Sequence, residues 1–363
     1  MVTVPKAFHG GASFEAIGVD LRDLSGRSEI VDADVLDAWY PPAPGVVASI
    51  GEHLPWLIKT SPPTHGDGLR RAIAEFRGID PSRVLIGGGT SSLMFLALPR
   101  LIKPGDTVTI LDPMYGEYAH LAEHVIGANL RRAELRFESD FLPDLADLAR
   151  TAQGSRLVIL VNPNSPTGRV VAPEFIRDLL AQLDSNTKLW VDETYIDFAG
   201  PGMSAEGIED PRLIISKSMS KYYALSGLRV GYLVGDPDWI RSMELFSPPW
   251  SVGLIGQLAG IEALSDANYY TGMAQETHRL REAFRAAVSA IPGFRALPAE
   301  ANYFMIELAS SDAQAQVKRL RAHGVYLRNC DSLSPRFNGR YLRTAVKSGP
   351  ENERILAAMR QLS

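Results

Sequence analysis

Short apolar runs alternate with helical stretches along much of the chain, and this alternation predicts a layered α/β fold. The apolar runs are short and, apart from Lys188, free of charge, as buried strands of a parallel sheet are. They lie at 84–86, 107–111, 157–161, 188–191, 213–215 and 230–234. Helical periodicity occupies 46–57, 69–76, 93–101, 117–126 and 173–183. We therefore expect a mainly parallel sheet with helices on both faces.

The pattern changes after residue 235, where strands and helices no longer alternate regularly. Helices are predicted at 238–246, 252–265, 269–291, 313–323 and 351–362, and strands at 294–297, 303–308, 325–328 and 341–346. These elements predict a smaller α+β domain made of 1–40 and 248–363, beside a large α/β domain of 41–247. Within the first segment, 32–39 is predicted as a short helix.

Polar residues gather just after the predicted strands, where open α/β sheets build their ligand sites. Gly87–Ser92 reads GGGTSS between a strand and a helix. A loop of this kind presents backbone N–H groups and the positive end of the helix dipole, which suits a phosphate. Gly89, Thr90 and Ser91 are the candidates, although glycine turns are common and a plain turn stays open as the alternative.

The stretch 213–235, LIISKSMSKYYALSGLRVGYLVG, carries the strongest chemical signal. It places Ser218 three residues before Lys221 and Arg229 eight residues after it. A lysine at a strand end, in a loop of small residues, can lose its proton and form a Schiff base. The alternative is a surface loop with solvated lysines.

Other strand ends carry further candidates. Tyr115 follows one strand and offers a flat aromatic ring. Asp192 and Tyr195 follow another, where Asp192 could instead cap a helix. His120 and His124 are spaced to share a helical face, but no third metal ligand stands near them, and we predict no metal site.

Composition narrows the class of protein. The 363 residues are 45% hydrophobic and 22% charged, with a formal net charge of −5. The chain shows no basic stripe, so we expect no nucleic-acid partner. A single cysteine, Cys330, excludes an internal disulfide and fits the cytoplasm. The longest uncharged stretch contains prolines, and we expect no membrane span.

Taken together, these residues resemble the fold type I pyridoxal-phosphate (PLP) enzymes of the class I/II aminotransferase family. The likeness is nearest to the branch of histidinol-phosphate aminotransferase and threonine-phosphate decarboxylase. It also rests on His9-Gly10-Gly11, on 222–229, and on Pro249-Trp250-Ser251-Val252. The resemblance implies a PLP-dependent transferase fold type I, with PLP as cofactor.

The resemblance also implies roles for the site residues. Lys221 would bind the cofactor aldehyde and move protons, Asp192 would pair with the ring nitrogen, and Tyr195 would bond the phenolic oxygen. The cofactor-binding set would be Gly89, Thr90, Ser91, Tyr115, Asn164, Ser165, Asp192, Tyr195, Ser218, Lys221 and Arg229. Ser165 stands where the family has an asparagine, and Asn164 is its possible substitute.

Arg343 resembles the arginine that clamps a substrate carboxylate, for which a guanidinium fork is suited. Arg328 and His9 are candidates for a second anionic group of the substrate. The leading hypothesis is an aminotransferase acting on a small anionic amino acid or amine, either phosphorylated, a phosphonate or a dicarboxylate, with a keto acid as acceptor. Decarboxylation of a phosphorylated amino acid is the alternative, and a non-catalytic binding module is a third reading. We also expect a homodimer.

Overall fold

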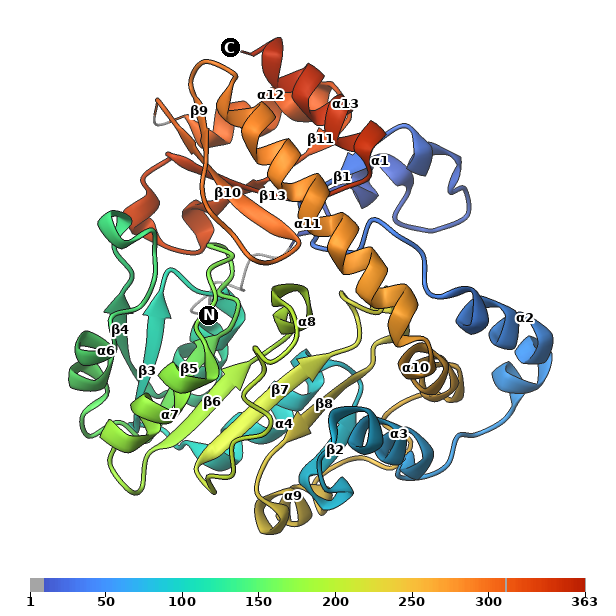
Figure 1. The fold of residues 1–363 in the computed structure, drawn as a ribbon, viewed down its shortest axis with the longest axis vertical. Helices are drawn as coiled ribbons and strands as arrows, with labels where there is room; N and C mark the ends of the chain where they lie inside the picture. The colour runs from blue at the N-terminus through green and yellow to red at the C-terminus, as the bar shows by residue number, and fades with distance from the viewer. Residues whose placement is uncertain (1–9, 311, 363) are drawn as a thin grey trace, which may run out of the picture.

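Two groups of strands with their covering helices make up the computed structural model, which describes residues 10–310 and 312–362 (Figure 1). The larger group is a seven-stranded sheet in the order β2-β8-β7-β6-β5-β3-β4. Its neighbouring strands are parallel except at β8, which is antiparallel to both β2 and β7. The predicted mainly parallel sheet is therefore confirmed.

The strands of this sheet follow the apolar runs closely. They are β2 (Val84–Gly87), β3 (Thr107–Asp112), β4 (Asn129–Glu134), β5 (Leu157–Val161), β6 (Lys188–Asp192), β7 (Leu213–Ser218) and β8 (Gly231–Val234). Strand β4 was not predicted. It lies at the sheet edge and exposes most of its side chains, so it lacks the apolar run that marks a buried strand.

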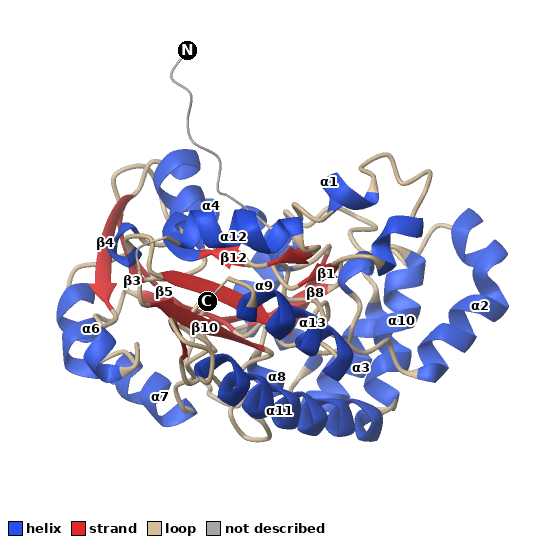
Figure 2. Ribbon diagram, turned by 90° about the horizontal axis from the view of Figure 1, so that it is seen from above, coloured by secondary structure: helices blue, strands red, loops and turns tan. Residues whose placement is uncertain are grey.

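Helices cover both faces of the sheet. In Figure 2, α4 lies on one side of the strands and α7 and α8 lie on the other. The helices of this part are α2 (Pro44–Lys59), α3 (Asp67–Arg77), α4 (Thr90–Leu101), α5 (Gly116–Ala119), α6 (Leu145–Ala152), α7 (Pro173–Gln182), α8 (Ile196–Ala199) and α9 (Pro237–Glu244). The predicted helix 117–126 forms as α5 followed by a π-helical segment, His120–Ile126.

The smaller group has two short sheets. One is antiparallel in the order β12-β13-β10-β9, and the other pairs β1 with β11 in parallel. Its elements are α1 (Phe14–Ile17), β1 (Val31–Asp32), α11 (Ala267–Ser289), β9 (Phe294–Ala296), β10 (Tyr303–Leu308), α12 (Ala313–Ala322), β11 (Val325–Tyr326), β12 (Arg328–Asn329), β13 (Tyr341–Ala345) and α13 (Gly349–Arg360). These elements share a hydrophobic core of their own.

The segment expected to form a helix at 32–39 does not do so. Val31 and Asp32 pair with Val325 and Tyr326, and the chain then runs extended toward α2. Strand pairing with a distant segment overrides the weak helical pattern here. The consequence is functional, because this extended segment crosses the space between the two groups of strands.

The division into two domains at residue 247 stays a prediction. Helix α10 (Leu254–Ser265) packs against α2 and α3, which belong with the large sheet, while α11 reaches from α10 to the smaller sheets (Figure 1). Within the described residues, no helix is both long and apolar enough to cross a membrane.

Candidate active site

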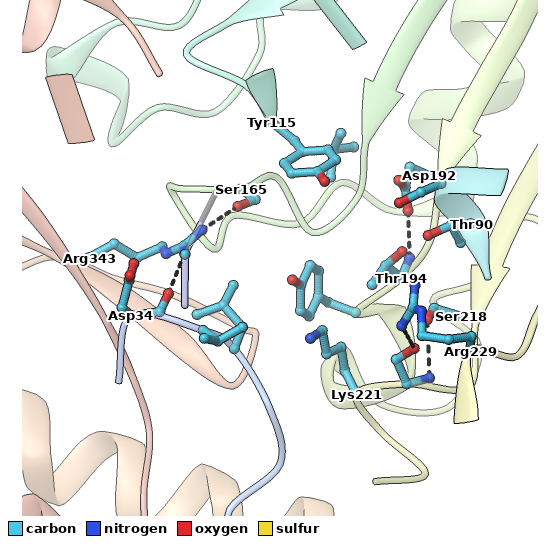
Figure 3. Close-up of a pocket in the computed structure, with 17 residues that line it drawn as sticks. Asp34, Thr90, Tyr115, Ser165, Asp192, Thr194, Ser218, Lys221, Arg229 and Arg343 are labelled. Atoms are coloured by element: carbon cyan, nitrogen blue, oxygen red, sulfur yellow. Dashed lines mark hydrogen bonds between the residues drawn. The ribbon is translucent and has the colours of Figure 1, made fainter. Parts of the chain in front are cut away.

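A cavity of about 230 Å³ lies where the two groups of strands meet. Figure 3 shows Asp192, Thr90, Ser218 and Arg229 on one side of it and Arg343, Ser165 and Asp34 on the other, with Lys221 between them. The predicted residues that line it are Thr90, Ser91, Tyr115, Ser165, Asp192, Tyr195, Ser218, Lys221, Arg229 and Arg343. Residues that are far apart in sequence are thus gathered in one place.

One end of the cavity is built to hold an anion. Gly89 caps α4 with a φ of 87°, and Thr90 and Ser91, the first two residues of the helix, line the cavity. The positive end of the helix dipole therefore lies at the cavity wall. The positive φ at this cap favours glycine, and a Cβ on Gly89 would stand 2.7 Å from Nη2 of Arg229, so the guanidinium lies close against the glycine. Arg229 itself has a φ of 53°, and its Nη1 donates to Ser220 Oγ at 3.2 Å. A phosphate fits the cation, the helix end and the hydroxyls.

Asp192, at the end of β6, is a buried carboxylate with neutral partners. Its Oδ2 accepts from the Tyr118 hydroxyl at 2.7 Å, and its Oδ1 accepts from the Thr194 N–H at 2.9 Å. Burial raises the pKa of Asp192, although these two hydrogen bonds oppose the shift. Within the described part of the chain, none of the ion pairs involves Asp192. A protonated ring nitrogen is the kind of cationic partner that this carboxylate lacks.

The two lysines of the 213–235 stretch have different surroundings. Lys221 lines the cavity, and its Nζ donates to Asp37 Oδ1 at 2.7 Å. Lys217 is fully buried behind the cavity, where its Nζ lies 3.2 Å from Glu193 and 3.0 Å from Glu206. Of the described residues that line the cavity, Lys221 is the one lysine.

Two tyrosines stand in the cavity as neutral phenols. Burial raises the pKa of Tyr115 to about 12, and it raises the pKa of Tyr195 as well. The Tyr195 ring packs edge-on against Tyr303, with centroids 4.9 Å apart. A buried neutral phenol can donate a hydrogen bond to an oxygen of a ligand, and a ring can cover a flat ligand.

Arg343 reaches the cavity from β13 and joins the two groups of strands. Its Nη1 donates to Ser165 Oγ at 3.0 Å and its Nη2 to the Asp34 carbonyl at 2.9 Å. These bonds fix the guanidinium plane at the wall of the cavity. An anionic substrate group can bind a cation held in this way.

Among the described residues, the predicted ones that are not part of the cavity lining are Asn164, Arg328 and Gly89, which directly precedes Thr90. The Nδ2 of Asn164 donates to the Pro113 carbonyl and to Thr167 Oγ1, and its expected cofactor contact stays a prediction. Arg328 instead lines a second cavity of about 340 Å³, and Asp34 forms part of the wall of both cavities. His9 lies outside the described residues.

Sequence reasoning missed Asp34, Asp37 and Thr194. Thr194 follows Asp192 directly, and the strand-end rule could have included it. Asp34 and Asp37 lie in the segment that was expected to be helical, and helical periodicity hides which of its side chains enter a site. The extended course of this segment brings Asp34 within 3.8 Å of Arg328.

Comparison with known proteins agrees with this geometry. The family model for aminotransferase class I and II matches residues 56–362. A histidinol-phosphate aminotransferase of Methanoculleus marisnigri is 29% identical over 355 residues, covering 97% of each chain. One of Moorella thermoacetica is 28% identical over 300 residues, covering 81% of this chain and 75% of that protein.

Solved structures share the fold. A histidinol-phosphate aminotransferase from Sinorhizobium meliloti, in complex with pyridoxal-5'-phosphate, aligns with a TM-score of 0.85 at 23% identity, covering 99% of this chain and 96% of that one. L-threonine-O-3-phosphate decarboxylase from Porphyromonas gingivalis aligns with a TM-score of 0.77 at 21% identity, covering 92% and 99%.

The residues in the cavity fit the cofactor of this family. The anion seat at Gly89 and Arg229, the buried carboxylate of Asp192 and the amine of Lys221 match the phosphate, ring nitrogen and aldehyde of PLP. Together with the family match over residues 56–362, this makes the chain a member of the class I and II aminotransferases, and therefore a PLP-dependent aminotransferase.

Proposed function

We propose that this protein transfers the amino group of a small donor whose anionic group binds Arg343, with Lys221 as the covalent residue. One observation carries this proposal: Lys221, Asp192 and Arg343 line the same cavity. Asp192 ends β6, Lys221 follows β7, and Arg343 belongs to β13. Transamination needs a covalent amine, an electron sink held in its charged form and a cationic clamp for the substrate.

The cofactor residues divide by the group that each would hold. Thr90, Ser91, Ser218 and Arg229 would bind the phosphate, and Asp192 would hold the ring nitrogen protonated. Tyr115 would cover the ring face, while Tyr195 and Ser165 would bond the phenolic oxygen. Bound PLP would supply the electron sink for the carbanion at the Cα of the donor.

Lys221 has a second task once its amine is free. A neutral amine at this position can take the Cα proton of the donor, because the electron pair of the broken C–H bond stays on carbon. The same nitrogen can then return the proton one carbon further along. Ser165 and Asp34 fix Arg343, which keeps the donor oriented during both transfers.

The donor that we propose carries a phosphate or a comparable anionic group. Two relatives are named histidinol-phosphate aminotransferase, which supports a phosphorylated amine. The site adds a physical reason, since Arg328 stands behind Asp34 at the wall of the second cavity, 3.8 Å from that carboxylate. A donor that reaches past Asp34 would meet this second cation.

We also propose that two copies of the chain form a dimer in the cytoplasm. Helix α2 exposes Val47, Trp56 and Ile58, whose exposed fractions are 57%, 53% and 69%. Apolar side chains gathered on one exposed helix favour a protein partner. Light scattering that gives a monomer mass for the active enzyme would contradict the dimer.

The reaction is tested with a panel of donors on the PLP-loaded enzyme. We expect phosphorylated amino acids or amines to give a keto or aldehyde product together with an aminated acceptor. Carbon dioxide release without such a product would replace transamination by decarboxylation.

Arg328→Ala separates the donors of this panel. It should raise KM for an anionic donor about tenfold or more and leave a neutral donor nearly unchanged, since a charge-assisted contact is lost. Equal effects on both donors would remove Arg328 from the substrate site.

A further inference from the structure

The amine of Lys221 is held by a carboxylate that the cofactor assignment does not use. Lys221 Nζ lies 2.7 Å from Asp37 Oδ1, and the Ser226 hydroxyl donates to the same oxygen at 2.6 Å. Ser226 begins the 3-10 turn Ser226–Leu228, five residues after Lys221 in the sequence. Asp37 comes from the extended segment before α2, so a distant part of the chain supplies the counter-ion.

This ion pair is poorly explained as a device for stability. The side chain of Asp37 is 47% exposed and that of Lys221 is 17% exposed. Pairs with this much solvent contact contribute about 1 kcal/mol or less to folding. The position of the pair indicates a role in function instead, because one partner is the amine at the centre of the proposed reaction.

Other charged and polar groups surround the pair without replacing Asp37. Burial alone would raise the pKa of the Asp37 carboxyl, but the positive charge of Lys221 lowers it below its usual value. The charge of Lys347, which precedes α13, lowers the pKa of Asp37 further. Asp192, Tyr195, Arg229 and Arg343 line the same cavity from other elements. Among the described residues, Asp37 is the only carboxylate within ion-pair distance of Lys221 Nζ.

We propose that Asp37 is a positioning residue for transamination, which binds the ε-ammonium that Lys221 becomes when it takes the Cα proton of the donor. When Lys221 takes the Cα proton of the donor, the C–H bond breaks, an N–H bond forms and a positive charge appears on Nζ. A fixed carboxylate 2.7 Å away stabilises that charge as it develops. Asp37 also keeps the ammonium inside the cavity, ready to return the proton.

The proposal rests on Lys221 as the covalent residue, and it is tested first in protein loaded with pyridoxamine phosphate. That ligand fills the site and leaves the lysine amine free. Trinitrobenzenesulfonate followed by peptide mapping then measures how fast Lys221 is labelled. Asp37→Asn should label Lys221 about tenfold faster or more, because the charge-assisted bond is gone. Ser226→Ala, which keeps the carboxylate, should stay within about threefold of the unmodified protein.

Steady-state kinetics supply the second readout. Asp37→Asn should lower kcat about 10- to 100-fold and leave the donor KM within about twofold, because the lost interaction forms with the transition state. A Cα-deuterated donor should show a larger isotope effect in this variant. Asp37→Glu, which restores the charge, should recover part of kcat.

Salt gives a test that needs no substitution. Because the pair is partly exposed, 1 M NaCl should speed the labelling of Lys221 in the unmodified protein. This arm decides the matter if Asp37→Asn does not fold. Unchanged labelling in salt, or an Asp37→Asn variant with normal labelling and normal kcat, would overturn the role of Asp37. Failure of the Lys221 assignment would look different, since reduction of the PLP-loaded protein would then label another residue.

Discussion

Single residues decide how this site differs from a generic one, and Ser165 is the clearest case. Its hydroxyl accepts from Arg343 Nη1 at 3.0 Å, so a short side chain serves where the resemblance leads one to expect an asparagine. Asn164 lies outside the cavity lining, and its Nδ2 donates to the Pro113 carbonyl and to Thr167 Oγ1. Ser165 therefore couples Arg343, the proposed substrate clamp, to the side of the cavity proposed to hold the cofactor.

Ser165→Ala should weaken the substrate clamp. The buried guanidinium of Arg343 loses a hydrogen-bond acceptor, and bonds to charged groups are worth about 1.5–3 kcal/mol. We expect kcat/KM for an anionic donor to fall about 10- to 100-fold. Ser165→Asn, which keeps an acceptor, should lose less. Steady-state kinetics with both variants check this, and an unaltered Ser165→Ala enzyme would show that Arg343 is held by other contacts.

Without cofactor, ionised Asp192 should lower the free energy of unfolding of the protein. Burial raises its pKa, so the folded chain binds this proton more tightly than the unfolded chain does. Stability without cofactor therefore falls as the pH rises from the unfolded pKa toward the raised folded pKa, and neutral pH lies on the unfavourable side.

Asp192→Asn should consequently melt at the same or a higher temperature without cofactor. Added PLP should raise the melting temperature of the unmodified protein more than that of the variant, because the ring nitrogen supplies the missing charge. Thermal melts at pH 7 with and without PLP test both statements. A variant that is less stable without cofactor but gains equally from PLP would make Asp192 a structural cap.

At the scale of elements, apolar runs predicted the strands and their ends predicted the cavity. The ends of β6 and β7 supply Asp192 and Ser218, because buried strands have an unmistakable apolar signature. For the segment 32–39 the same reasoning gave a wrong prediction, because the helix expected there does not form. Its course is decided by pairing of Val31 and Asp32 with a strand almost at the other end of the chain, which no local pattern contains. Asp34 and Asp37 were missed for that reason.

Lys217 belongs to a buried ionic cluster that supports the ends of β6 and β7. Its Nζ lies 3.2 Å from Glu193 and 3.0 Å from Glu206. Lys217→Met would leave Glu193 without its cation, whereas Glu206 would keep Arg77 at 3.7 Å, and the change should lower the free energy of unfolding by about 3–5 kcal/mol. Lys188→Met, on the partly exposed start of β6, should change it by about 0.5 kcal/mol or less. Urea denaturation of both variants measures these free energies. Equal small losses would show that the buried cluster around Lys217 does not stabilise the fold.

At the scale of the whole molecule, the site exists because two groups of strands meet. The large sheet supplies the lysine, the carboxylate and the anion seat, while β13 of the smaller group supplies Arg343. Arg343 bonds Ser165 from one group and Asp34 from the segment between them. The alternation of strands and helices predicted the large sheet, but the closeness of the two groups follows from packing that sequence periods do not encode.

The central claim is that Lys221, and not Lys217, carries the cofactor. Borohydride reduction of the PLP-loaded protein fixes the carbon–nitrogen link permanently, and peptide mapping by mass spectrometry locates it. Lys221 lines the cavity while Lys217 is enclosed by carboxylates behind it, so the label should fall on Lys221 alone. Label on Lys217, or on a lysine outside the cavity, would contradict the assignment of the cofactor residues and the mechanism that depends on them.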